Sequence, residues 1–158
     1  MDDLLIASKN PKAIVDELSK EYTLKGVGPP KYYLGADMER INEPENVFTM
    51  GSGTYIDKCL TIYEQLFGEQ PSRKVFTPLD PKDHPEMDTS AFLDKTGIHL
   101  YWKLLGMLQW AITLGRIDIM CATMTMGGFR AQPRQGHLDR LKRIFGFLRR
   151  HKKSAIKF

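Results

Sequence analysis

Two adjacent carboxylates, Asp2 and Asp3, stand at the start of the chain, directly before an apolar, strand-like stretch over residues 4–8. Side chains alternate between faces along a strand, so neighbouring aspartates converge on one site only where the backbone turns tightly, as at a hairpin tip. Acids gathered at such a tip can hold Mg²⁺ for two-metal phosphoryl transfer. Taken alone, Met-Asp-Asp is a weak motif, and an acidic N-terminus is the simpler interpretation.

A second group of charged residues lies at the other end of the chain. Residues 130–158 hold ten Lys or Arg against the single acid Asp139, whereas residues 1–129 carry a net charge of −5. Such a block indicates a solvated face or a polyanion partner, and the second gains weight where the basic residues share a helix with an apolar stripe. We expect a helix over about 135–150 that buries Leu138, Leu141, Ile144, Phe145 and Leu148 and exposes Arg140, Lys142, Arg143, Arg149 and Arg150.

Before residue 70 the pattern predicts alternating helices and strands. Asn10-Pro11 is a cap followed by proline, and Thr54 with Asp57 approximates a capping box. Period-two alternation over 33–39 predicts a half-buried strand. The expected elements are a helix over 11–22, a strand over 33–39 paired with 47–50, and a helix over 54–67 that ends at Gly68.

The second half of the chain is predicted to be helical. Residues 71–96 contain four prolines and form a surface connection, in which a solvated loop explains His84 and its neighbouring aspartates better than a metal site does. The helix from Ile98 has two apolar faces, one of them carrying Trp102, Gly106 and Trp110, which implies burial from both sides. An aromatic stripe at helical spacing is more often core than a binding platform. A further helix carries Ile117, Met120, Cys121 and Met124, and we expect both Cys59 and Cys121 in the core.

Length and hydropathy limit the class of protein. A chain of 158 residues is one ordinary domain or a piece of a larger one. Its apolar stretches fall short of the roughly 18 residues that suggest a membrane span, and no signal segment opens the sequence. We therefore expect no membrane partner and no export.

The order of these motifs resembles the reverse transcriptase of copia-type LTR retrotransposons. The resemblance covers nearly the whole chain: the Asp-Asp hairpin, Lys31 to Gly35, Tyr55 to Asp57, Thr77 to Leu79, Tyr101 to Trp110, Arg116 to Ile119 and His137 to Leu148. It corresponds to the C-terminal portion of that enzyme, with Met1 inside the Tyr-x-Asp-Asp box, so that the fingers, an earlier palm aspartate, the integrase and the RNase H domain are expected to be missing. One departure is Ile117, which replaces the proline of the family's Arg-Pro-Asp-Ile segment.

The resemblance implies an α+β fold, with a partial palm of short antiparallel strands plus a helix followed by a mostly helical thumb- and connection-like region. It implies three segments: 1–70 (palm and thumb-like), 71–96 (proline-rich connection) and 97–158 (helical, with the basic C-terminal helix). It assigns Asp2 and Asp3 as ligands of catalytic Mg²⁺. Primer or nucleic-acid contacts are expected from Tyr33, Leu34 and Gly35 and from Arg140, Lys142, Arg143, Arg149 and Arg150. The expected partners are an RNA template, a DNA primer and the remainder of the polyprotein, in a cytoplasmic particle or the nucleus.

Three interpretations stay open at this point. The first is a fragment of an RNA-directed DNA polymerase that is inactive alone, because carboxylates from more than one segment are needed to hold two metals. The second is a non-catalytic nucleic-acid-binding remnant that relies on the basic helix. The third is a relic with no selected function.

Overall fold

The computed structural model describes residues 4–41 and 47–158 and has an α+β architecture. Within these residues lie five α-helices and one antiparallel sheet of order β1-β2-β3-β4. The helices are α1 (Pro11–Glu21), α2 (Gly53–Phe67), α3 (Lys95–Thr113), α4 (Met120–Gly127) and α5 (Gln135–Arg150), and the strands are β1 (Tyr32–Tyr33), β2 (Ala36–Ile41), β3 (Val47–Gly51) and β4 (Ala155–Lys157). Short 3₁₀ turns lie at η1 (Pro85–Met87) and η2 (Ile117–Ile119).

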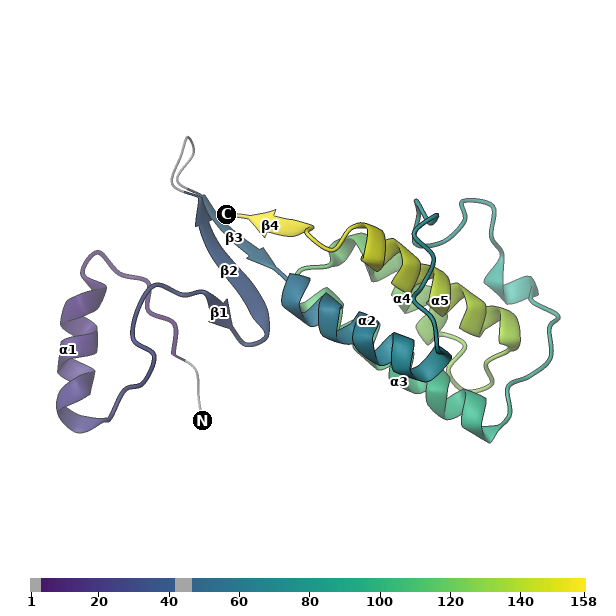
Figure 1. Cartoon of the computed structure of the whole chain (residues 1–158), viewed down its shortest axis with the longest axis horizontal. Coiled ribbons are helices and arrows are strands. Elements are labelled where there is room, and N and C mark those ends of the chain that lie inside the picture. The colour runs from purple at the N-terminus through teal and green to yellow at the C-terminus, as the bar shows by residue number, and fades with distance from the viewer. Residues whose placement is uncertain (1–3, 42–46) are drawn as a thin grey trace.

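The elements are strung out along the molecule. Figure 1 shows α1 at one end, the sheet in the middle and α2 to α5 packed together at the other end. The hydrophobic core lies among these four helices and includes Tyr101, Leu108, Leu141 and Phe145, each fully buried. In the part of the chain that the structure describes, no helix combines the length and the apolar character needed to cross a bilayer.

Helix α1 forms as the sequence predicts but covers no core. Asn10 caps it by accepting a hydrogen bond from the backbone N–H of Ala13, and Pro11 occupies the first turn. No residue of α1 is buried, and Ile14 and Tyr22 on its apolar side remain exposed.

The strand expected over 33–39 is two strands joined by a tight turn. Tyr33 pairs with Ala36, so Leu34 and Gly35 form a two-residue hairpin turn with φ values of 47° and 93°. These positive φ angles are the geometry that two-residue hairpins require. The expected pairing with the following strand is confirmed, since β2 lies antiparallel to β3 from Asp37 opposite Gly51 onwards.

Helix α2 is capped from the sheet and not by its own sequence. The capping box expected at Thr54 and Asp57 is wrong, because the helix begins at Gly53 and the side chain of Ser52 forms no capping bond. The Thr54 N–H instead donates to Oδ2 of Asp37 on β2 at 2.8 Å. The predicted end is confirmed, with Gly68 in the left-handed region at φ 72°.

Burial in α3 and α4 differs from the expectation. Trp102 and Trp110 are each 50% exposed, so α3 is covered on one side only, and the prediction of burial from both sides is wrong. On α4 the buried side chains are Ala122, Thr123 and Met126, whereas Met120, Cys121 and Met124 face outward. Cys59 is in the core as expected, but Cys121 is not.

Candidate nucleic-acid interface

Helix α5 carries the basic residues that the sequence singled out, and much of its charge holds the chain's own connection. Residues 71–90 run antiparallel to α5, and arginines of α5 and of its N-cap hydrogen-bond to them along their length. The bonds, in order along the connection, are Arg149 to the carbonyl of Pro71, Arg150 to that of Arg73, Arg143 to Thr77, Arg140 to Asp83 and Asp88, and Arg134 to the carbonyl of Ser90. This set of contacts is here called the arginine clamp.

Arg140 is the centre of the arginine clamp. Its Nε and NH2 donate to the two carboxylate oxygens of Asp83 at 2.7 and 2.6 Å, and its NH1 donates to Asp88. Only 18% of the Arg140 side chain is exposed, against 17% for Asp83 and 9% for Asp88. The expectation that α5 exposes Arg140 is therefore wrong.

The ion pairs shift the protonation equilibria of both acids. The hydrogen bonds from Arg140 hold the pKa of Asp83 below its usual value. Hydrogen bonds from Ser90, together with those from Arg140, lower the pKa of Asp88 to about 2. The same carboxylates raise the pKa of Arg140, so the cluster is fully ionised at neutral pH.

The remaining basic residues of α5 are only partly engaged within the chain. Lys142 lies over the ring of Phe67, 4.6 Å from its centroid, and Arg150 lies over Phe76 at 4.1 Å. The Arg143 side chain is 34% exposed. The charged groups of these side chains therefore remain partly accessible to solvent, unlike the guanidinium of Arg140.

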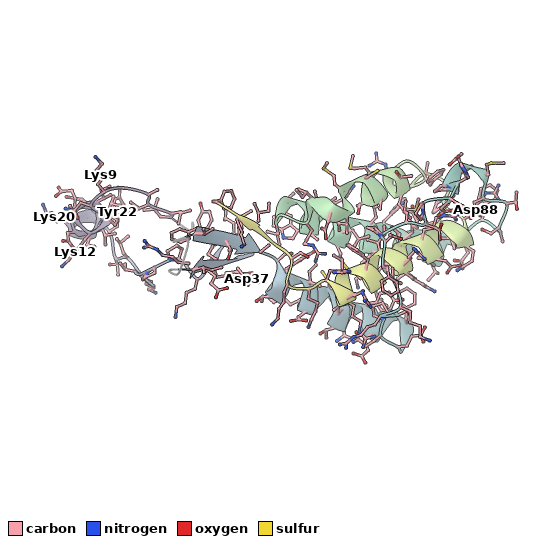
Figure 2. All side chains as sticks on the ribbon, turned by 90° about the horizontal axis from the view of Figure 1, so that it is seen from above. Lys9, Lys12, Lys20, Tyr22, Asp37 and Asp88 are labelled. Carbon is pink, nitrogen blue, oxygen red and sulfur yellow. The ribbon has the colours of Figure 1, made fainter. Side chains whose placement is uncertain are left out.

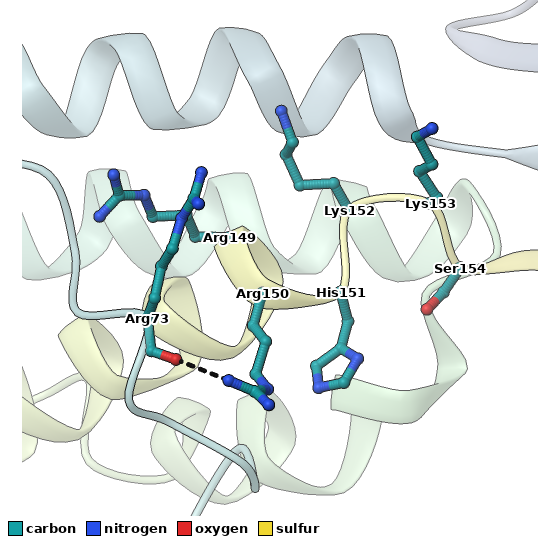
Figure 3. A pocket seen from close by; sticks show the side chains of 7 residues that line it. All are labelled: Arg73, Arg149, Arg150, His151, Lys152, Lys153 and Ser154. Carbon is teal, nitrogen blue, oxygen red and sulfur yellow. Dashed lines mark hydrogen bonds between the residues drawn. The ribbon is translucent and has the colours of Figure 1, made fainter.

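A basic groove of about 640 Å³ lies where α5 ends. Figure 3 shows it between the connection at Arg73 and the turn that leads from α5 into β4. It is lined by Arg73, Arg149, Arg150, His151, Lys152, Lys153 and Ser154, with no acid among them. An adjoining hollow shares Arg73, Arg149 and Lys152, and there Asp57 binds Lys152 at 2.6 Å.

The groove combines cations that are far apart in the chain. Arg149 and Arg150 were predicted as contacts, but Arg73, Lys152 and Lys153 were not. The lysines directly follow the helix in sequence and could have been included from that signal, whereas Arg73 joins only through the folded connection. Within residues 4–41 and 47–158, the side chains of Arg73 and Lys153 form no ion pair.

The predicted contact residues Tyr33, Leu34 and Gly35 lie at the β1–β2 turn, apart from the groove. Leu34 at the tip is 59% exposed. A Cβ on Gly35 would lie 3.6 Å from Nε1 of Trp110, so the turn packs beside the end of α3. The structure does not bring this turn and the basic groove into one site.

The predicted metal ligands Asp2 and Asp3 lie outside the described residues. Among residues 4–41 and 47–158, no group of three or more His, Cys, Asp and Glu side chains is arranged to hold a metal ion. The magnesium site therefore stays a prediction from the resemblance.

Comparisons with known proteins relate the chain to retrotransposons. It is 24% identical over its full length to the transposon Ty5-1 protein YCL074W of Saccharomyces cerevisiae, of which the aligned region spans 50%. It is 26% identical over 94% of its length to 10% of the retrovirus-related Pol polyprotein from transposon RE1 of Arabidopsis thaliana. No protein-family model and no solved structure matches. The chain thus spans half or less of these relatives and is related to a segment of a retrotransposon polyprotein.

Proposed function

We propose that the chain is the C-terminal part of a retrotransposon reverse transcriptase, beginning inside the Tyr-x-Asp-Asp box, and that it holds nucleic acid in the basic groove. The observation that carries this proposal is the groove itself. Five Lys or Arg side chains line it, no acid does, and Arg73 and Lys153 have no ion pair there to displace. A surface of this kind fits a phosphate backbone, because each neutralised phosphate releases condensed counterions.

The polymerase relationship adds the catalytic expectation. The similarity to a Pol polyprotein supports it, and the resemblance assigns metal binding to Asp2 and Asp3. In that assignment bound Mg²⁺ would activate the 3′-hydroxyl of the primer and stabilise the leaving group. The described residues would position the duplex.

Salt-dependent binding tests the groove. A fluorescent RNA–DNA hybrid is titrated with the full chain at several salt concentrations and followed by anisotropy. If about four phosphates are neutralised and the B-DNA coefficient of about −0.9 per phosphate is applied to the hybrid, log affinity falls against log salt with a slope of about −3.6. Arg73→Gln or Lys153→Gln should each reduce the slope by about 0.9 and weaken binding of every sequence alike.

Lys12→Gln is the matched control. Lys12 is exposed on α1, at the opposite end of the molecule from the helical bundle (Figure 2). Its loss removes the same charge and should leave the slope unchanged. A flat salt dependence, or equal effects of Lys12→Gln and Lys153→Gln, would show that the groove does not bind nucleic acid.

A non-catalytic nucleic-acid-binding module is the second candidate. The separation of the groove from the Asp-Asp hairpin in sequence favours it, since the groove needs no catalytic acid. Primer extension on poly(rA)/oligo(dT) with Mg²⁺ tests for polymerase activity of the chain itself. Incorporation that is lost in Asp2→Asn would exclude the non-catalytic module, whereas hybrid binding without incorporation is expected both of that module and of a polymerase fragment that is inactive alone.

A further inference from the structure

The outward face of α3 carries two half-exposed tryptophans, which is unusual for such large apolar side chains. Trp102 and Trp110 are the two tryptophans of the chain, and each is 50% exposed. Gly106 lies between them, and a Cβ there would meet nothing within 4 Å. The two rings therefore lie on either side of an open position on the helix surface. The surface made by Trp102, Gly106 and Trp110 is here called the tryptophan face.

A hydrogen bond to a neighbouring segment and a ring contact within α3 hold the Trp102 ring in place. The Trp102 indole N–H donates to the carbonyl of Arg130 at 2.8 Å, and its ring stacks on His99 with centroids 5.5 Å apart and planes at 26°. The Trp110 ring lies beside the Leu34–Gly35 turn. Rings that are already ordered lose little conformational entropy when a ligand stacks on them.

The charged residues within α3 itself are all basic. Helix α3 contains no Asp or Glu, and Lys95 and Lys103 are both exposed. The two tryptophans are eight positions apart on the helix, a rise of about 12 Å. This exceeds the roughly 3.4 Å per nucleotide of a stacked strand, so the two rings would meet different bases.

We propose that the tryptophan face binds the unpaired bases of single-stranded nucleic acid by stacking on Trp102 and Trp110, with Lys103 facing the phosphates. Stacking needs exposed aromatic faces beside positive charge, and it tolerates any sequence because every base has a π-face. The inference rests on the proposed function for the class of ligand, but the tryptophan face shares no residue with the basic groove. It would hold a single strand while the groove holds duplex.

Intrinsic fluorescence tests this directly, because all tryptophan emission comes from this face. The full chain is titrated with oligo(dT) and with an abasic oligodeoxynucleotide of the same length and charge. We expect quenching by oligo(dT) and none by the abasic strand. Trp102→Ala and Trp110→Ala should each weaken oligo(dT) binding, measured by anisotropy, roughly tenfold or more.

Two further variants separate stacking from folding. Trp102→Phe keeps an aromatic face and should retain most of the affinity, although it loses the bond to Arg130. Tyr22→Ala removes an aromatic that is 66% exposed at the C-cap of α1 and should not change oligo(dT) binding. Far-UV circular dichroism and thermal unfolding confirm that each variant is folded.

The outcomes distinguish this inference from the proposed function. Two results would refute base stacking on the tryptophan face and leave the groove proposal standing. The first is salt-dependent hybrid binding with no change of tryptophan fluorescence on adding oligo(dT). The second is equal fluorescence quenching by oligo(dT) and by the abasic strand. Absence of binding to any nucleic acid would overturn both. A protein-concentration-dependent dimer in sedimentation that Trp110→Ala abolishes, with no response to oligo(dT), would make the face an interface between copies and refute base stacking.

Discussion

Replacing Arg140 by leucine should destabilise the fold by an amount that depends on pH. The substitution keeps an apolar stem on α5 but leaves Asp83 and Asp88 without their shared cation. Removing one partner of a buried pair costs about 3–5 kcal/mol. Solvent reaches 18% of the Arg140 side chain and weakens the pairing, so we expect about 2–3 kcal/mol at pH 7.

The sign of the pH dependence follows from the carboxylates. Their folded pKa values are depressed, to about 2 for Asp88, below the value of about 3.9 for aspartate in an unfolded chain. The stability that they contribute is complete above about pH 5 and is lost as pH falls toward 2. In Arg140→Leu the acids lack this depression by the guanidinium, so the gap between wild type and variant should shrink over that range.

Urea unfolding followed by circular dichroism at pH 7, 5, 4, 3 and 2.5 measures the gap. At pH 7 the midpoint temperature should also fall by about 5–10 °C. Arg143→Leu is the matched control, because the Arg143 hydrogen bonds go to the carbonyl and hydroxyl of Thr77 and its ion pair with the exposed Asp80 is long, at 4.0 Å. A gap for Arg140→Leu that stays constant from pH 7 to 2.5 would refute the assignment of its energy to the carboxylates.

Three further outcomes test the packing. Gly146→Ala on α5 should lower the free energy of unfolding in urea by about 1–3 kcal/mol, because the added Cβ would lie 2.6 Å from a backbone oxygen of the connection. Gly106→Ala, where the Cβ meets open space, should instead raise it by up to about 1 kcal/mol, and equal effects of the two variants would contradict the close approach at Gly146. Ile117→Pro places a residue suited to the first position of the η2 turn, so the free energy of unfolding should stay unchanged or rise by up to about 1 kcal/mol. A large loss of stability would show that the backbone N–H of Ile117 is needed. At pH 8 a disulfide reagent should modify the exposed Cys121 quickly and Cys59 only on unfolding, because burial raises the pKa of the Cys59 thiol to about 11. Rapid modification of both cysteines would mean that the core opens readily.

Local signals in the sequence predicted the helices well. The Asn10-Pro11 start, the Gly68 stop and the apolar stripe of α5 each act through neighbouring residues, and all three are confirmed. The turn at Leu34–Gly35 was missed because apolar alternation continues across it, and leucine seldom adopts a positive φ. The cap on α2 was missed because Asp37 lies 17 residues away.

Periodicity shows which side of a helix is apolar but not what covers it. For α3 the pattern gave two apolar sides, and only packing shows that one of them, with Trp102 and Trp110, stays half exposed. The same limit applies to charge. Arg140 reads as a solvent-facing cation on α5, yet its partners Asp83 and Asp88 lie 57 and 52 residues away in the chain.

The charge available to a polyanion is therefore smaller and more localised than the sequence indicates. Within residues 130–158, two carboxylates neutralise Arg140, and Arg143 and Arg149 donate hydrogen bonds to the connection. The arginine clamp in turn places Arg73 beside the end of α5, where it joins Lys152 and Lys153 in the basic groove. Hydrogen bonds from the last turn of α5 hold the connection at the groove, and the ion pairs of Arg140 hold it farther along. A variant that loosens the connection should therefore weaken binding in the groove even though it removes no cation from it.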